Sequence, residues 1–349
     1  MLRGFFLPRY CRVIMGRMLS LFLAIFLAAP VQTASFIYLD PSADQTVRRA
    51  MNATYNLDLA EARRAARSLQ STRPDHPVGF VLEAETYWWE AQIDPTRDDI
   101  EDQFFKIQEK AISIGEKALK AKKYPAVEIQ AYLASAWGSK ARFRLTQNGV
   151  GVGVVMDGRT AHNYAEEVYQ ADPKYTDILV GIGAYNYFTG KIPSVLKPFA
   201  YFLGASGDPV LGLQQIRTVA EKGRYARTEA KIVLFTALMK DGAYADSFKV
   251  VQGLMSEYPA NHALYAWVTE WYLDQGKKAD GIAYFEKLQA EKMATSTRLA
   301  QYALFQKAIL QAEDEKNADA LATLRRVRAI GTTEAALGRT VAAMEKALR

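Results

Sequence analysis

The feature that most constrains the fold is a series of helix-length amphipathic segments that recur along the chain. Prolines follow such segments at Pro74, Pro125, Pro173 and Pro259. Ala, Leu, Lys, Glu, Arg and Gln dominate the periodic stretches, and these residues favour helix by propensity as well as by pattern. We find no clear run of alternating apolar and polar residues that would indicate a strand. The sequence therefore predicts an all-α chain.

The clearest segment begins with the turn Gly242-Ala243-Tyr244, continues with apolar and small residues at helical spacing, and closes at Pro259. The segment that follows repeats the pattern without a closing proline, at Tyr265, Tyr272, Gly276, Gly281, Phe285 and Leu288. This pattern resembles the tetratricopeptide repeat, in which a Gly-x-Tyr turn joins two antiparallel helices. Partial units are carried by Ala50, Ala53, Ala62, Ala66 and Leu69, by Phe80, Ala84 and Tyr87, and by Leu179, Ile182 and Gly183.

The resemblance implies a right-handed superhelical solenoid of antiparallel helix pairs over residues 44–330. Small residues let paired helices approach closely, and large residues fill the space between successive pairs. A single pair cannot bury its apolar face, so the pairs stack, and the ends of the stack need caps. We expect residues 331–349 to form the C-terminal capping helix.

The spacing of the closing prolines indicates insertions in the repeats. The intervals from Pro74 to Pro125 and from Pro125 to Pro173 are 51 and 48 residues, longer than the roughly 34 residues of the standard repeat. We place insertions near 93–102, 146–158 and 191–208. The glycine-rich segment 146–158 is expected to be an inter-helix loop, and residues 195–203 a short extra helix.

The N-terminus has the pattern of an export signal. Residues 1–34 contain four arginines and no acidic residue, and an apolar run over 19–29 precedes the small residues Ala34 and Ser35. That run is too short to span a bilayer of about 30 Å as a helix, which favours a cleaved signal over an anchor. We expect cleavage near Ala34, a short extended segment over 35–43, and a periplasmic or secreted protein without a transmembrane span. Met15 and Met18 are alternative start sites.

The charge of the chain depends on this segment. The formal net charge is +6, but without residues 1–34 the chain has 40 Lys and Arg against 38 Asp and Glu, a charge of +2. The basic charge was the main argument for a nucleic-acid partner, because binding of nucleic acid requires a basic face. A charge of +2 no longer supports that interpretation. The one cysteine, Cys11, lies in the same segment. The processed chain would therefore have no disulfide, thiol catalysis or cysteine-based metal site.

We identify no catalytic residues, metal site or cofactor site in the sequence. The chain has neither a Gly-x-Ser-x-Gly elbow nor a P-loop, and the glycines near residue 150 lack the dinucleotide-binding spacing. His162 and Glu166 stand four residues apart, but we favour a polar surface pair over a metal site. His76 and His262 follow the ends of repeats at equivalent places, which indicates a role in turns.

The best candidate for function is the concave face that the first helix of each tetratricopeptide pair lines. That face typically receives an extended peptide or a helix, so the resemblance implies a protein or peptide partner. We expect an aromatic stripe in the N-terminal half of this groove and charged residues in the C-terminal half. Its candidate residues are Glu85, Trp88, Trp89, Trp137, Lys140, Tyr187, Phe188, Lys240 and Glu270. Buried aromatic anchors can each contribute about 2 kcal/mol or more at an interface.

The sequence leaves several alternatives open. Aromatic residues at helical spacing are more often core than groove. A small-ligand or glycan-binding module would place Trp88, Trp89 and the glycine loop in an enclosed pocket. A helical-solenoid hydrolase would need two carboxylates about 5–9 Å apart in a cleft. A purely structural role is also compatible with the sequence, and the oligomeric state and the partner's identity are not encoded in any motif.

Overall fold

The protein is described here from a computed structural model that covers residues 41–148, 151–192 and 207–349. All regular elements in these ranges are helices, and their bounds are as follows: α2 (Pro41–Tyr55), α3 (Leu59–Thr72), α4 (Val78–Ile93), α5 (Asp99–Ala121), α6 (Ala126–Asn148), α7 (Val152–Ala171), η2 (Thr176–Ile178), α8 (Leu179–Gly190), α10 (Pro209–Lys222), α11 (Arg227–Lys240), α12 (Tyr244–Glu257), α13 (Ala263–Asp274), α14 (Lys278–Met293), α15 (Thr297–Glu313), α16 (Asn317–Ala329) and α17 (Ala335–Leu348).

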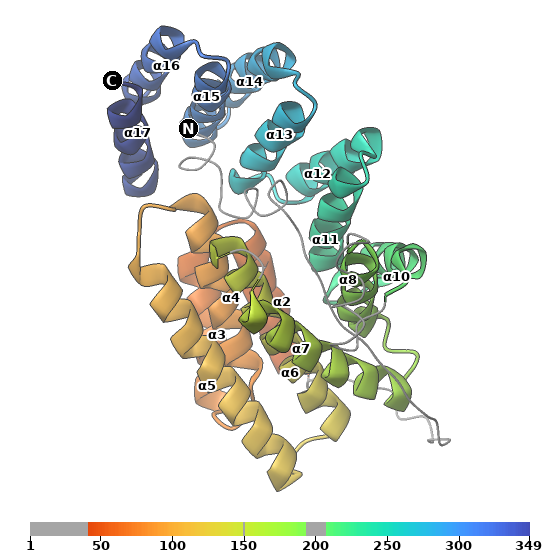
Figure 1. Cartoon of the computed structure of the whole chain (residues 1–349). Helices are drawn as coiled ribbons and strands as arrows, with labels where there is room; N and C mark the ends of the chain where they lie inside the picture. Colours follow the sequence, from red (N-terminus) through yellow and green to blue (C-terminus); the bar gives the residue numbers. More distant parts are fainter. Residues whose placement is uncertain (1–40, 149–150, 193–206) are drawn as a thin grey trace.

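Helices that follow one another in sequence pack against one another along the whole chain (Figure 1). The pairs are α2/α3, α4/α5, α6/α7, α8/α10, α11/α12, α13/α14 and α15/α16, and α17 packs on the last of them. The prediction of an all-α solenoid is confirmed. Each pair buries small residues where its helices meet; on α3, for example, Ala62, Ala65 and Ala66 are fully buried.

Four of the pairs share one turn geometry between their two helices. The second residue after the first helix has a left-handed backbone, with φ between 60° and 69°, at Leu57, Gly242, Gly276 and Glu315. The amide of the residue that follows then donates to the carbonyl five residues earlier, and each of these bonds is 2.9 Å long. The four bonds run from Asp58 to Ala53, from Ala243 to Leu238, from Lys277 to Tyr272 and from Lys316 to Gln311. Glycine adopts this conformation without strain, so the sequence revealed two of the four turns.

The solenoid also closes on itself, because its first helices contact segments that lie far along the chain. The Asn261 side-chain amide donates to the Tyr55 carbonyl at 2.8 Å, although 206 residues separate them. Arg339 on α17 forms an ion pair with Asp94 at the end of α4. The Tyr225 hydroxyl bonds to the Asp44 carboxylate on α2. A stack of helix pairs in which each contacts only its neighbours would not form these contacts.

The structure corrects some of the expected boundaries. Residues 41–43 belong to α2 and are not extended, and residues 35–40 lie outside the described ranges. The expected loop over 146–158 is mostly helix, since α6 reaches Asn148 and α7 begins at Val152. These two helices pack closely along their length, and such packing overrides the low helix propensity of glycine. The extra helix expected over 195–203 falls outside the described residues.

The insertion near 93–102 is shorter than expected, because α4 ends at Ile93 and α5 begins at Asp99. The expected capping helix over 331–349 corresponds to α17. A search of the described residues for helices long and apolar enough to cross a membrane identifies none.

Candidate functional site

The aromatic residues expected in the groove lie in the hydrophobic core. Trp88 is fully buried and Trp89 is 2% exposed. The two rings meet edge to face at 5.0 Å between centroids, and Trp89 stacks on Trp267 of α13 at 6.3 Å. Tyr55 of α2 packs on Trp89 from another side. The expectation that Trp88 and Trp89 line an open groove is corrected, because closure of the solenoid brings α13 against α4 and fills that face with the protein's own rings.

Beside these rings, Glu85 joins a polar cluster that spans three helices. Arg142 of α6 donates to Glu85 of α4 and to Glu229 of α11, each at 2.5 Å. The Ser139 hydroxyl donates to the same Glu85 carboxylate, and the Arg142 guanidinium lies 4.1 Å from the centroid of the Trp88 ring. Burial raises the pKa of Glu229, and the neighbouring Arg142 opposes that rise. The cluster ties the first half of the chain to the second.

The other predicted residues are dispersed. The Lys140 ammonium lies 3.4 Å from a Glu109 oxygen and 4.9 Å from the centroid of the Trp137 ring. Lys140 itself is only 7% exposed, and Trp137 is half-buried beside a separate core cluster. These two residues share no surface with Trp88 and Trp89.

Tyr187, Phe188 and Lys240 lie around a further core cluster. The Tyr187 hydroxyl donates to the Ala237 carbonyl at 2.8 Å, and its buried ring meets Phe188 edge to face at 5.1 Å. Burial and the nearby Lys191 lower the pKa of Lys240. Glu270 on α13 is 5% exposed. The nine predicted residues therefore form no continuous stripe on the surface.

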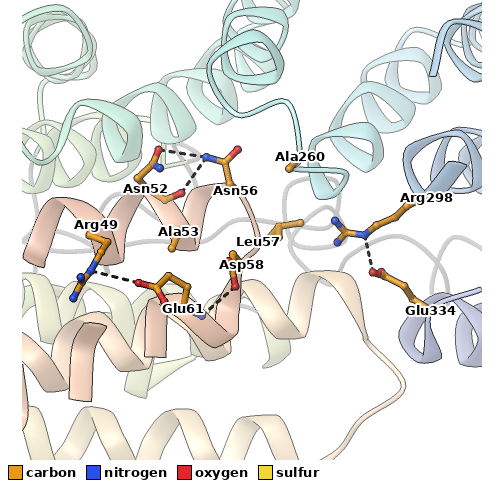
Figure 2. Close-up of a pocket in the computed structure, with 10 residues that line it drawn as sticks. All are labelled: Arg49, Asn52, Ala53, Asn56, Leu57, Asp58, Glu61, Ala260, Arg298 and Glu334. Carbon is orange, nitrogen blue, oxygen red and sulfur yellow. Dashed lines mark hydrogen bonds and ion pairs between the residues drawn. The ribbon is translucent and has the colours of Figure 1, made fainter. Parts of the chain in front are cut away.

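A different feature offers space for a ligand, namely a cleft where the two ends of the solenoid meet (Figure 2). Its volume is about 660 Å³. We call it the end-to-end cleft and define it by the residues that line it: Arg49, Asn52, Ala53, Asn56, Leu57, Asp58, Glu61, Ala260, Arg298 and Glu334. Seven of these come from α2, the turn that follows it and the start of α3, and the other three come from positions 260, 298 and 334.

Local sequence positions the side chains on the α2–α3 wall. Asn52 and Asn56 stand one helical turn apart, and the Asn56 amide donates to the Asn52 side chain at 3.3 Å. Asp58 caps α3 by accepting from the Glu61 amide at 3.0 Å. Leu57 keeps the left-handed backbone of the turn and buries its side chain, since it is only 8% exposed.

Each end of the cleft has an arginine paired with a carboxylate. Arg49 Nε lies 3.4 Å from Glu61, and Arg298 Nε lies 2.7 Å from Glu334. The Tyr302 hydroxyl donates to the other Glu334 oxygen at 3.1 Å. Figure 2 shows these two pairs on opposite sides, with Asn52 and Asn56 between them. The walls thus carry positive and negative side chains, together with amide groups that can both donate and accept hydrogen bonds. Such walls are suited to hydrogen bonding with a peptide.

Sequence reasoning missed this cleft, because no local motif brings residues 49–61 next to residues 298 and 334. The left-handed turn at Leu57 carried no glycine signal, and the paired arginines look like ordinary solvated helix faces in the sequence. Only the closure of the solenoid places them together.

The histidines do not form a metal site among the described residues. The distance from His162 Nε2 to Glu166 is 3.9 Å, and the His162 ring stacks on Tyr185 with centroids 3.9 Å apart. Burial lowers the pKa of His162 to about 4. His76 has the expected role in a turn, because its Nδ1 accepts from the Val78 amide at 3.2 Å. Within the described ranges, no group of three potential ligands gathers in a geometry for a metal ion.

No protein-family model matches the chain, and no curated protein matches it. Among solved structures, a tetratricopeptide repeat protein from Parabacteroides merdae is similar at 15% identity, over 87% of this chain and 99% of that chain, with a TM-score of 0.38. The TPR domain of P58(IPK) is similar at 13% identity, over 88% and 98% of the two chains, with a TM-score of 0.22. Yeast Tom70 is similar at 12% identity, over 87% and 88%, with a TM-score of 0.20. The paired helices and shared turns described above show an all-α solenoid of antiparallel helix pairs.

Proposed function

We propose that this tetratricopeptide-like chain is a non-catalytic scaffold that binds a segment of a protein partner in the end-to-end cleft. The observation that carries the proposal is the cleft itself, a space of about 660 Å³ on a helical-repeat fold whose expected groove is filled. A cavity of this size is within the range of ordinary ligand sites. Its charged and amide walls favour an extended polar segment over an apolar helix.

The walls also argue against a catalytic role for the cleft. Glu61 is held by Arg49 and by Arg64, and Glu334 is held by Arg298 and by Tyr302. A carboxylate that acts as a general acid or base must be free to meet the proton it transfers, whereas all four oxygens of Glu61 and Glu334 already face protein donors. We therefore propose that the paired side chains of the cleft bind a ligand and do not transfer protons.

A photo-crosslinking experiment tests this site. In the full-length protein, a benzophenone amino acid at position 52 should capture the partner in cells that make the protein. The same amino acid at Asn163, an exposed position on α7, should not. The double variant Asn52→Arg/Asn56→Arg should weaken binding of the captured partner at least tenfold, about 1.4 kcal/mol, because it fills the cleft with bulk and charge.

The matched control is Asn163→Arg, which makes the same substitution on an exposed face. Circular dichroism verifies that all variants remain folded. Equal capture from positions 52 and 163, or undiminished binding by the double variant, would show that the partner docks elsewhere.

We also propose that the scaffold works outside the cytoplasm, in the periplasm or as a secreted protein. The support is the arginine-containing N-terminus and the apolar run over residues 19–29, which have the form of a cleavable signal. The mature protein is expected to begin near Ser35. Intact-mass measurement of the exported protein checks this expectation, and a mature chain that still contains Cys11 would contradict it.

A further inference from the structure

A second cavity lies on the other side of the turn between α12 and α13. Its volume is about 220 Å³, and the residues that line it are Gln252, Met255, Ser256, Tyr258, Pro259, Asn261, Tyr265, Tyr284 and Lys292. Ala260 lines the end-to-end cleft while Pro259 and Asn261 line this cavity, so the turn separates the two spaces. We call this second space the tyrosine pocket.

The polar groups of the tyrosine pocket divide into those already bonded and those without a partner. The Tyr258 hydroxyl bonds to Thr228 at 2.6 Å, and the Asn261 side chain bonds to the Tyr55 carbonyl and the Ala263 amide. In contrast, the Tyr265 hydroxyl is shielded from solvent and has no hydrogen-bond partner among the described residues. Tyr265 as a whole is 2% exposed. A buried hydroxyl in such a position normally has a partner.

One cation lines the pocket, and the carboxylate of Glu257 lies behind the wall, where it accepts from the Tyr258 hydroxyl at 3.2 Å. Lys292 is the one ionisable group other than tyrosine that lines it, and no described carboxylate is among the lining residues. Lys292 takes part in none of the ion pairs formed within the described ranges, whereas Lys287 on the same helix lies 3.9 Å from Glu291. An ammonium with three donors and no protein counter-ion is suited to a single negative charge.

The remaining walls are mixed, and the space between them limits the size of the ligand. Gln252 and Ser256 add polar groups, while Met255, Pro259 and the tyrosine rings supply the apolar part. A dry cavity of about 150 Å³ accommodates benzene, so a space of about 220 Å³ has room for one six-membered ring and a small polar group. A phosphate would bring a charge near −2 to a wall with one cation.

We propose that the tyrosine pocket binds a small organic carboxylate, whose body of about one ring packs between the tyrosine faces. The carboxylate pairs with the Lys292 ammonium, and the Tyr265 hydroxyl donates to one of its oxygens. This site is distinct from the end-to-end cleft, so its occupancy does not depend on the protein partner proposed above.

The test uses the full-length protein and three probes, with binding followed by isothermal titration calorimetry and protein-observed NMR. Benzoate and cyclohexanecarboxylate carry the charge on an aromatic and a saturated ring, and benzamide is the neutral analogue. Both carboxylates should bind at least tenfold more tightly than benzamide, because hydrogen bonds to charged groups are stronger than those to neutral amides.

Two variants and a control complete the design. Lys292→Gln should weaken benzoate binding at least tenfold, and Tyr265→Phe should weaken it about threefold to tenfold. Lys287→Gln, one turn or more away on α14 and largely exposed, should leave the affinity within twofold. Binding of benzamide as tight as benzoate, an unchanged affinity in Lys292→Gln, or no binding of either carboxylate would each overturn the proposal.

Discussion

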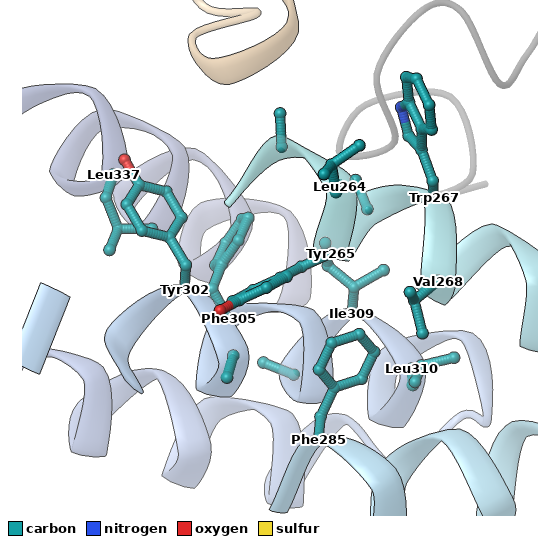
Figure 3. Close-up of a cluster of buried hydrophobic side chains, with 14 of the residues drawn as sticks. Leu264, Tyr265, Trp267, Val268, Phe285, Tyr302, Phe305, Ile309, Leu310 and Leu337 are labelled. Atoms are coloured by element: carbon teal, nitrogen blue, oxygen red, sulfur yellow. The ribbon is translucent and has the colours of Figure 1, made fainter. Parts of the chain in front are cut away.

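Replacing Trp267 with alanine is expected to lower the free energy of unfolding by about 3–5 kcal/mol. Trp267 is 1% exposed and stacks between Trp89 of α4 at 6.3 Å and Phe235 of α11 at 5.3 Å. Figure 3 shows Trp267 on α13 at one edge of the buried cluster. Alanine would leave a cavity at the place where the first and later helix pairs meet. Urea unfolding followed by circular dichroism measures the loss.

The same variant tests how the solenoid is held closed. In a stack where each pair contacts only its neighbours, a single core substitution has a local effect, and stability is a sum over neighbouring pairs. Because Trp267 joins helices that are far apart in sequence, its removal should broaden the urea transition or split it in two.

Trp271→Ala is the matched control, since Trp271 is on the same helix. Its ring is half-buried, packs on Phe248 at 4.5 Å, and donates to the Tyr244 carbonyl at 2.8 Å. We expect a smaller loss of about 1–2 kcal/mol and an unbroken transition. If Trp267→Ala is no more destabilising than Trp271→Ala, the aromatic contact with α4 does not hold the ring of helices together.

Replacing Arg142 with methionine is expected to destabilise the protein by about 3 kcal/mol at pH 7. The substitution keeps an unbranched apolar stem, shorter than that of arginine, and removes the cation that Glu85 and Glu229 share. Two half-buried carboxylates would then lie close together without a counter-ion, which costs more than losing the pair as a whole. Equilibrium unfolding in urea gives the difference from the parent protein.

The size of this effect should depend on pH in a defined direction. Burial already raises the pKa of Glu229, and Arg142 is the cation that opposes the rise. A carboxyl group with a raised pKa in the folded state makes stability fall as pH rises through the window above its ordinary value of 4.5. Without Arg142 the pKa rises further, so the destabilisation should be larger at pH 7 than at pH 5.

Two further variants separate charge from packing at this cluster. The triple variant Arg142→Met/Glu85→Gln/Glu229→Gln should recover at least half of the lost stability, because neutral amides need no counter-ion. Arg64→Met removes an exposed arginine from its ion pair with Glu61 and should change stability by less than about 1 kcal/mol. A loss that stays constant between pH 5 and pH 7 would mean that the two carboxylates do not carry the effect.

The sequence by itself determined the helices and the way neighbouring helices pair. Small and apolar residues repeat at helical spacing, for example on α3 and α12. Gly242 and Gly276 mark turns, because glycine adopts a positive φ without strain. These signals are local, so one sequence is enough to detect them. The equivalent turns at Leu57 and Glu315 escaped prediction, because those residues give no local sign of a left-handed backbone.

The tertiary structure alone decided which surfaces are available for binding. The resemblance to tetratricopeptide repeats placed Trp88 and Trp89 on the inner face of the solenoid, but whether that face stays open depends on how far the stack curves. The curvature is the sum of small rotations over all the pairs, and here it brings α13 onto α4. The inner face then becomes core, and the end-to-end cleft forms from residues up to 285 positions apart, from Arg49 to Glu334. No local pattern encodes that distance.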